Sequence, residues 1–252
     1  MPRSTNTTAK YVYGVVRAPA KGGFKGKGIH GKPLRTVSWE GLGALTSDVP
    51  DAELEAGRDE LLTHSRVLER ALKRGVVLPM RFGTVMPSEA SVRDDLLAAH
   101  REELEAQLEE MGEKVEINIK GIYEEQPVLE EVVRENPEIA QLRESLQGKP
   151  EEATYYERIR LGELVAEALT AKREVDERVY VDRLSPHAVG VEVGQATHER
   201  MAVNASFLVE RDRLADFDRA IEELGAEQAG RVRFRYTGPL PPHSFVELSL
   251  EG

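Results

Sequence analysis

The stretch EKVEINIKGIY, Glu113–Tyr123, decides how this chain is organised. Its apolar residues occupy every second position, and polar residues such as Glu116 stand between them. A period of two is typical of a β-strand, so we expect the apolar residues to face one way and Glu116, Asn118 and Lys120 the other. The helical pattern before this stretch ends near Gly112. We therefore predict two domains, an N-terminal one at residues 1–112 and a C-terminal one at 113–252.

The segments after this strand predict the architecture of the C-terminal domain. Two helical stretches come first, and the next elements are an antiparallel strand pair, a helix capped by Asp212 and a last strand. Their ranges are 127–147 (broken at Pro137), 153–183, 187–194 with 198–211, 213–227 and 231–238. This order is the βαββαβ order of a ferredoxin-like domain, in which helices cover one face of an antiparallel sheet. The predicted fold class is α+β, with a modified ferredoxin-like C-terminal domain.

The N-terminal domain is also predicted to be α+β. A strand at 10–16 precedes two short strands within 34–49, which turn at Glu40–Gly41. A helix that Asp51 caps and Gly75 ends then carries an apolar stripe, and a short strand at 76–78 follows. A second helix runs from its N-cap Ser88 to Gly112. The two stripes are Leu54, Leu61, Leu62, Leu68 and Leu72, and then Val92, Leu96, Leu97, Leu104 and Leu108.

The composition excludes several kinds of site. The 252 residues contain no cysteine, so disulfides, thiolate catalysis and cysteine-based zinc sites are absent. The six histidines are scattered without ligand spacing, and no phosphate-binding glycine motif occurs. We expect neither a metal nor a cofactor. No apolar run approaches the length of a membrane span, and the first residues lack the apolar core of a secretory signal, so we expect a cytoplasmic protein without membrane association.

Charge is distributed unevenly along the chain. Residues 1–39 contain basic side chains and no acid, whereas the whole chain carries a formal net charge of −11. The basic N-terminal residues are either a solvated, mobile extension or a means of steering an acidic partner. The acidic remainder lacks the continuous basic face that nucleic-acid binding needs, so we expect no nucleic-acid partner.

Four segments resemble one known family. They are YVYGVV (11–16), VLPMRFGTV (77–85), NASFLVER (204–211) and RYTGPLPPHSFVEL (235–248). Together they resemble the gas vesicle accessory proteins of the GvpF/GvpL family. The pairing of VLPMRFGT with a distant GPLPP-x-SFV is what makes the resemblance specific, and the likeness runs from Tyr11 nearly to the end of the chain.

The resemblance implies a non-enzymatic protein that supports the assembly of gas vesicles. The implied partner is the small hydrophobic shell protein (GvpA-type), and other accessory proteins of the same machinery are further candidates. The family supplies no catalytic residues. Physically, we expect an acidic carrier with an exposed sheet edge or apolar groove to cover the strand-prone surface of the shell protein before it reaches the wall.

Two segments contain the candidate site residues. In LPMRFG, the Arg81 guanidinium either pairs internally with a neighbouring acidic helix or binds a partner. The proline-rich segment 237–245 either presents a rigid apolar ridge or packs back on the N-terminal domain. We expect both segments at a domain junction or a partner contact. The residues are Leu78, Pro79, Met80, Arg81, Phe82, Gly83, Gly238, Pro239, Leu240, Pro241, Pro242 and Phe245.

Two other functions compete with an assembly factor. Ferredoxin-like domains host unrelated functions, so a small-molecule-sensing or regulatory module is the main alternative. An enzyme is the weakest, because no nucleophile–base pair, metal set or phosphate loop can be assembled from the sequence. Glutamate-rich helices between Glu102 and Glu157 are interpreted as solvated faces.

Overall fold

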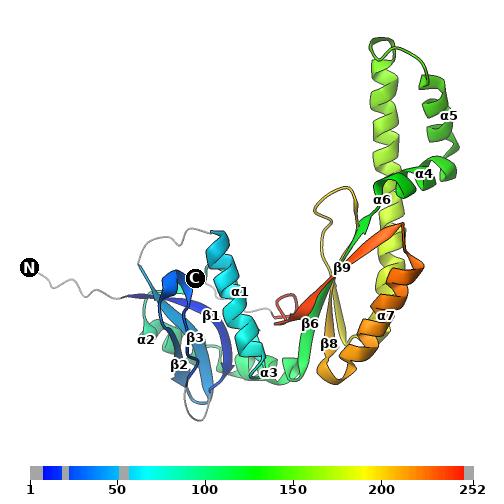
Figure 1. Cartoon of the computed structure of the whole chain (residues 1–252). Coiled ribbons are helices and arrows are strands. Elements are labelled where there is room, and N and C mark those ends of the chain that lie inside the picture. The colour runs from blue at the N-terminus through cyan, green and yellow to red at the C-terminus, as the bar shows by residue number, and fades with distance from the viewer. Residues whose placement is uncertain (1–7, 19–22, 51–56, 247–252) are drawn as a thin grey trace, which may run out of the picture. The chain divides into compact units, whose positions relative to one another are not determined.

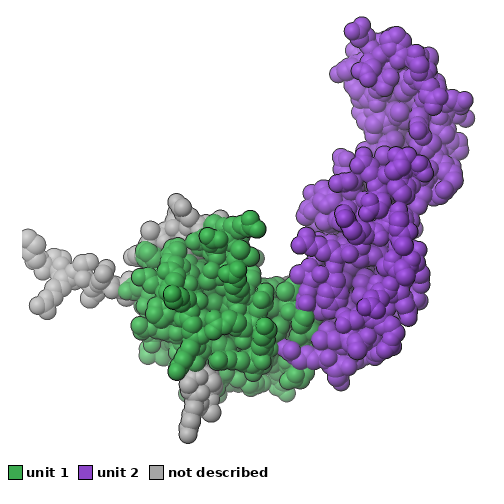
Figure 2. Space-filling view, in the orientation of Figure 1, with its two compact units in different colours: residues 1–116, 239–252 green, residues 117–238 purple. Residues whose placement is uncertain are grey.

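The structure of the protein is a computed structural model that describes residues 8–18, 23–50 and 57–246. It is a mixed α/β fold with two antiparallel sheets and seven α-helices among these residues (Figure 1). By their contacts, the described residues form two compact units (Figure 2). Unit 1 contains the residues up to 116 together with those from 239 onward, and unit 2 contains residues 117–238.

The sheet of unit 1 is built around its first strand. The order is β2-β3-β1-β4, and β5 also pairs with β1. The strands are β1 (Ala9–Arg17), β2 (Leu34–Trp39), β3 (Leu42–Val49), β4 (Val77–Pro79) and β5 (Val85–Met86). The predicted hairpin is confirmed, since β2 and β3 pair antiparallel around Glu40 and Gly41, both with positive φ. Two positive φ values are what a tight two-residue hairpin turn requires.

The first helix, α1 (Arg58–Leu72), differs from its prediction at both ends. It begins at Arg58 with Gly57 as its N-cap and ends before Lys73, three residues short of the glycine expected to end it. Asp51 and Leu54 lie outside the described residues. The stripe holds only in the second half of the helix: Leu68 and Leu72 are buried, whereas Leu61 and Leu62 are exposed. The prediction that Leu61 and Leu62 belong to the buried stripe is therefore wrong for the first turns of the helix.

The second helical region of unit 1 is interrupted. Its parts are α2 (Glu89–Ser91), a π-helical segment η2 (Val92–Ala98) and α3 (Arg101–Met111). Ser88 is the N-cap as predicted, and its hydroxyl accepts a hydrogen bond from the Ser91 amide. The whole predicted apolar stripe from Val92 to Leu108 is buried. The wide π turn keeps these residues on one face although the region is not one continuous α-helix.

The elements that form unit 2 follow in the predicted order. They are β6 (Lys114–Tyr123), α4 (Glu125–Glu135), α5 (Pro137–Leu146), α6 (Tyr155–Leu184), β7 (Gly190–Val193), β8 (Met201–Glu210), α7 (Leu214–Glu227) and β9 (Val232–Leu240). Short 3₁₀ turns of unit 2 are η3 (Glu152–Thr154), η4 (Ser185–His187) and η5 (Arg211–Arg213), and unit 1 contains η1 (Ile29–Gly31). Asp212 lies inside η5 and is not the helix cap that we expected, because α7 begins after Arg213 without a side-chain cap.

The sheet of unit 2 has the order β7-β8-β6-β9, with α6 and α7 on one face (Figure 1). Aromatic contacts fix both helices to it. Phe217 of α7 meets Phe207 of β8 at 5.2 Å between ring centroids, and Tyr180 of α6 meets Phe234 of β9 at the same distance. A Cβ at Gly121 would come within 2.9 Å of Val203, so a glycine is needed in β6 for this layer to close.

Candidate functional site

An aromatic cluster in unit 1 underlies the LPMRFG segment. Tyr11 and Tyr13 project from β1, and their ring centroids lie 4.8 Å apart. His64 of α1 is 5.7 Å from both the Tyr13 and the Phe82 rings, and its edge-on contact with Phe82 joins the helix to the β4–β5 connection. Both tyrosines are fully buried. The segment therefore packs on a buried aromatic cluster. The sequence analysis missed this cluster because the apolar stripe predicted for the helix consisted of leucines and did not include His64.

Hydrogen bonds define the protonation of this cluster. The Gly83 amide donates to the Tyr11 hydroxyl oxygen at 3.1 Å, and the same hydroxyl lies 2.8 Å from His64 Nδ1. Burial, followed by the charge of His243, lowers the pKa of His64 to about 4. At neutral pH His64 is thus an uncharged imidazole, and its Nδ1 shares a hydrogen bond with the Tyr11 hydroxyl, which keeps its proton. Burial also raises the pKa of Tyr11, so the cluster is neutral.

The LPMRFG residues divide into a buried half and an exposed half. Leu78, Pro79 and Met80 are buried. Arg81 and Gly83 are exposed, and Phe82 is half-buried between them. A tight turn causes the change, because the Thr84 amide and hydroxyl both donate to the Arg81 carbonyl oxygen and Gly83 has a φ of +89°.

Arg81 lies at the exposed turn of this segment. Within the part of the chain that the structure describes, its guanidinium forms no hydrogen bond or ion pair. Its side chain is exposed at the outside of the turn, and its neighbours Met80 and Phe82 are the residues that pack inward. Apolar neighbours in the sequence were a poor guide to burial here because the chain turns at this residue.

The proline-rich segment is divided in the same way. Gly238 and Pro239 are exposed at the end of the edge strand β9, Leu240 and Phe245 are half-buried, and Pro241 and Pro242 are buried. Both oxygens of Glu116 accept hydrogen bonds at 2.8 Å from Ser244, one from its amide and one from its hydroxyl. Glu116 is only 4% exposed, although it alternates with the apolar residues of β6. A carboxylate that accepts two such bonds can be buried, which the alternating pattern could not indicate.

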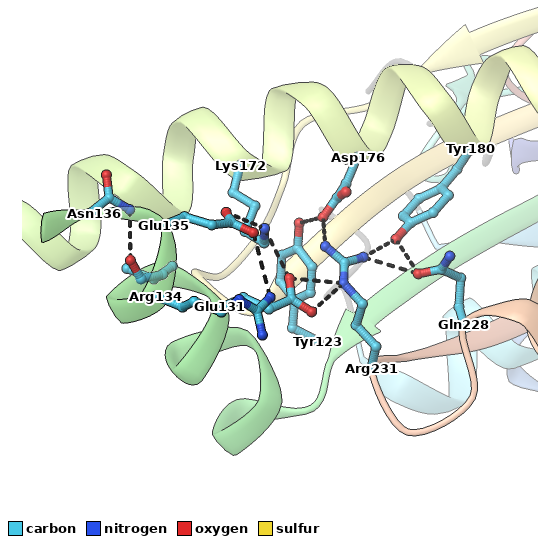
Figure 3. Close-up of polar contacts among 11 residues, drawn as sticks. Tyr123, Glu131, Arg134, Glu135, Asn136, Lys172, Asp176, Tyr180, Gln228 and Arg231 are labelled. Atoms are coloured by element: carbon cyan, nitrogen blue, oxygen red, sulfur yellow. Dashed lines mark hydrogen bonds and ion pairs between the residues drawn. The ribbon is translucent and has the colours of Figure 1, made fainter. Parts of the chain in front are cut away.

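A polar network in unit 2 centres on Arg231 and was not predicted from the sequence (Figure 3). Its guanidinium donates to both Glu131 oxygens at 2.8 and 3.0 Å and to Asp176 at 2.6 Å. It also donates to the Tyr180 hydroxyl oxygen at 2.6 Å and to Gln228 at 3.0 Å. Burial disfavours the charged guanidinium, but these bonds outweigh it and the pKa of Arg231 is raised.

Further residues extend the network across unit 2. The Tyr123 hydroxyl donates to Asp176 at 2.6 Å, and Lys172 lies 2.9 Å from Glu131 and 2.8 Å from Glu135. Burial raises the pKa of Tyr180 to about 12. The network joins β6, α4, α6 and the start of β9. Glu131 is thus paired and only 16% exposed, which corrects our interpretation of the glutamate-rich helices as solvated at this position, whereas Glu135 is paired but half exposed.

Two kinds of site are absent from the described residues. No group of three or more His, Asp or Glu side chains among them is placed to hold a metal ion. Every helix within the described ranges is too short or too polar to span a membrane.

Comparison with known proteins decides the family. The model of the family described as "Gas vesicle synthesis protein GvpL/GvpF" matches residues 9–247. The chain belongs to the GvpL/GvpF family. A gas vesicle protein F from Streptomyces sp. (strain CB03234) is 37% identical over 243 residues, covering 94% of this chain and 99% of the relative. The GvpL/GvpF resemblance that the four sequence segments predicted is thereby confirmed.

Solved structures of the family have the same fold. The crystal structure of GvpF from Anabaena sp. PCC7120 matches with a TM-score of 0.81 at 25% identity, covering 96% of this chain and all of that one. GvpF from Microcystis aeruginosa matches with a TM-score of 0.77, also at 25% identity, with the same coverage of this chain. The GvpL/GvpF fold therefore extends over both units.

Proposed function

We propose that this GvpL/GvpF chain is an assembly factor that binds the hydrophobic shell protein of gas vesicles and supports their formation without catalysing a reaction. The observation that carries the proposal is the family match over residues 9–247. Curated relatives over nearly the same length are named gas vesicle protein F. The proposed location is the cytoplasm, in association with gas vesicles.

The physical role follows from the chemistry of such a partner. Strand-forming apolar subunits pair with one another through exposed edges and form aggregates unless that surface is covered. A chain with a formal net charge of −11 keeps a bound apolar subunit dispersed by repulsion between complexes. Other accessory proteins of the vesicle are further proposed partners.

We assign the contact with the shell protein to the exposed half of the LPMRFG segment. Arg81 offers a guanidinium without a partner among the described residues, at a turn supported by the buried aromatic cluster. Exposed apolar side chains belong to the elements around that cluster. Leu61 lies one helical turn before His64 and is 46% exposed, and Val85, opposite Tyr11 in the sheet, is 41% exposed. Exposed apolar side chains together with an arginine that is unpaired among the described residues suit a partner that is apolar with a few acids.

The buried residues of the two segments have a bracing role in this proposal. Leu78 and Met80 are packed in the core of unit 1, and Pro241 and Pro242 are buried beside Ser244, which binds Glu116. Substituting them would act through stability. Contact and bracing are therefore assigned to different residues of the same segments.

We also propose that residues 117–238 form a modified ferredoxin-like domain and that unit 1 contains the second domain. The strand order β7-β8-β6-β9 supports this, because the first strand of the unit is central and lies between the third and the fourth. The paired helices α4 and α5, inserted before α6, are the modification.

Co-expression with the shell protein tests the function. With this chain present, we expect more shell protein in the supernatant and its co-purification; unchanged amounts of both would refute the proposal. For Arg81→Ala and Arg81→Glu we expect lost co-purification and a stability within about 0.5 kcal/mol of the parent. Arg178→Glu is the matched control, because Arg178 is an exposed arginine of α6 in unit 2. An equal loss with this control would place the contact elsewhere.

A further inference from the structure

The first half of α6 has a face that no described residue covers. Tyr155, Ile159, Gly162 and Ala166 recur at i, i+4, i+7 and i+11, which places them on one side of the helix. All four are exposed, Tyr155 to 60% and Ile159 to 43%. Tyr156 adjoins them with 81% of its surface exposed. Large aromatic and aliphatic side chains at this exposure are typical of a surface that a partner buries.

The intramolecular contacts of this half of α6 lie on its other side. Leu161, Leu164 and Ala168 are half-buried there, and α5 runs alongside the helix (Figure 1). A hollow of about 680 Å³ lies near Ala166, the C-terminal end of the free face. Its lining includes Val165 and Leu169 of α6, Leu129 of α4 and residues 198–200. The free face is therefore not the seam of the α5–α6 pair, and it leads into a partly apolar hollow.

Gly162 is a second, independent sign of a missing partner. It lies in the interior of a helix of 30 residues, where glycine is less favourable than almost any other residue. A Cβ built at this position meets no atom within 4 Å, so none of the residues that the structure describes requires a glycine there. Small residues in a helical seam let a second helix approach closely, as Gly162 and Ala166 would allow.

The charges beside this face indicate what kind of helix fits. Glu163, Glu167 and Glu174 follow one flank of α6 and are exposed. None of the three forms an ion pair with another described residue. A row of free carboxylates favours a partner that presents lysine or arginine at the matching flank.

We propose that the face formed by Tyr155, Tyr156, Ile159, Gly162 and Ala166 binds an amphipathic helix of a partner protein, with an apolar seam flanked by Lys or Arg. From Tyr155 to Ala166 the face is about 17 Å long, so about three turns of the partner are in contact. This site is in unit 2 and involves none of the residues assigned to the shell protein. It therefore goes beyond the proposed function and is tested independently of it.

Binding of designed peptides to the full chain tests this inference. The probe is a labelled 21-residue amphipathic helix with leucine in its seam and lysine on its flanks, and its counterpart has glutamate in place of lysine. Fluorescence anisotropy should show binding of the basic peptide, and Kd at least about tenfold weaker for the acidic one. Gly162→Leu and Tyr156→Ala should each raise the Kd of the basic peptide by about tenfold or more.

Matched variants separate docking from general attraction and from damage to the fold. Val175→Leu adds bulk at an exposed position of α6 outside the face, and Glu222→Arg removes an acid from α7; both should leave Kd unchanged. Gly162→Leu should keep or raise Tm, because it improves helix propensity without a clash. Equal binding by Gly162→Leu, or an equal loss with Glu222→Arg, would overturn the proposal. So would a dimer in sedimentation that Tyr156→Ala abolishes, since the occupant would then be a second copy.

Discussion

Replacing Arg231 by alanine should destabilise unit 2 strongly. The side chains of Arg231, Glu131 and Asp176 are only 22%, 16% and 15% exposed. Removing the cation leaves two largely buried carboxylates, and their remaining partners are Lys172 on Glu131 and the Tyr123 hydroxyl on Asp176. Loss of one partner from a buried ion pair costs roughly 3–5 kcal/mol, and partial solvent access places this site at about 3 kcal/mol. For a unit of this size, that lowers Tm by roughly 10 °C.

Urea unfolding followed by circular dichroism measures the loss, and hydrogen exchange assigns it to residues 117–238. Arg233→Ala is the matched control. Arg233 is two residues further along β9, is 75% exposed and only approaches Glu124 at 4.0 Å, so its removal should cost less than about 0.5 kcal/mol. If Arg231→Ala also cost less than about 1 kcal/mol, the network would be an ordinary surface cluster. The argument from burial would then be refuted.

Two further predictions concern unit 1. The pKa of His64 is about 4 in the folded chain and near 6.5 when unfolded, so the unfolded state gains the proton first as pH falls. The contribution of His64 to the free energy of unfolding is fully present above pH 6.5, and roughly 2–3 kcal/mol of it is lost as the pH falls from 6.5 to 4. His64→Gln should flatten this part of the stability–pH curve measured by urea unfolding. Parallel curves for the variant and the parent would contradict the assignment. Ser244→Ala removes the hydroxyl that donates to the buried Glu116 and should cost about 1 kcal/mol in urea unfolding, with no comparable loss for Ser145→Ala at an exposed hydroxyl of α5.

Local signals were enough to predict most elements. Glu40–Gly41 marked a hairpin because a two-residue turn needs positive φ, and the stripe from Val92 to Leu108 marked a buried helical face. These features depend on neighbours in the sequence. They were correct even where the helix contains a π-helical segment.

Features that depend on distant partners could not be predicted in this way. Glu116 is buried because Ser244 meets it from 128 residues away, and Glu131 is paired because Arg231 arrives 100 residues later. Arg81 is exposed because the chain turns there, although its neighbours are apolar. For the two candidate segments, the division of each into packed and accessible residues required coordinates.

The separation of Glu131 and Arg231 along the chain also has a consequence for biosynthesis. During translation, α4 and α6 leave the ribosome with Glu131, Asp176 and Lys172 before the guanidinium that joins them exists. Until β9 emerges, the carboxylates of the nascent chain remain hydrated, and the two helices have little reason to close on the sheet. Unit 2 should therefore acquire its native state only after Arg231 has left the ribosome. A truncation before residue 231 should yield a loosely packed, protease-sensitive product.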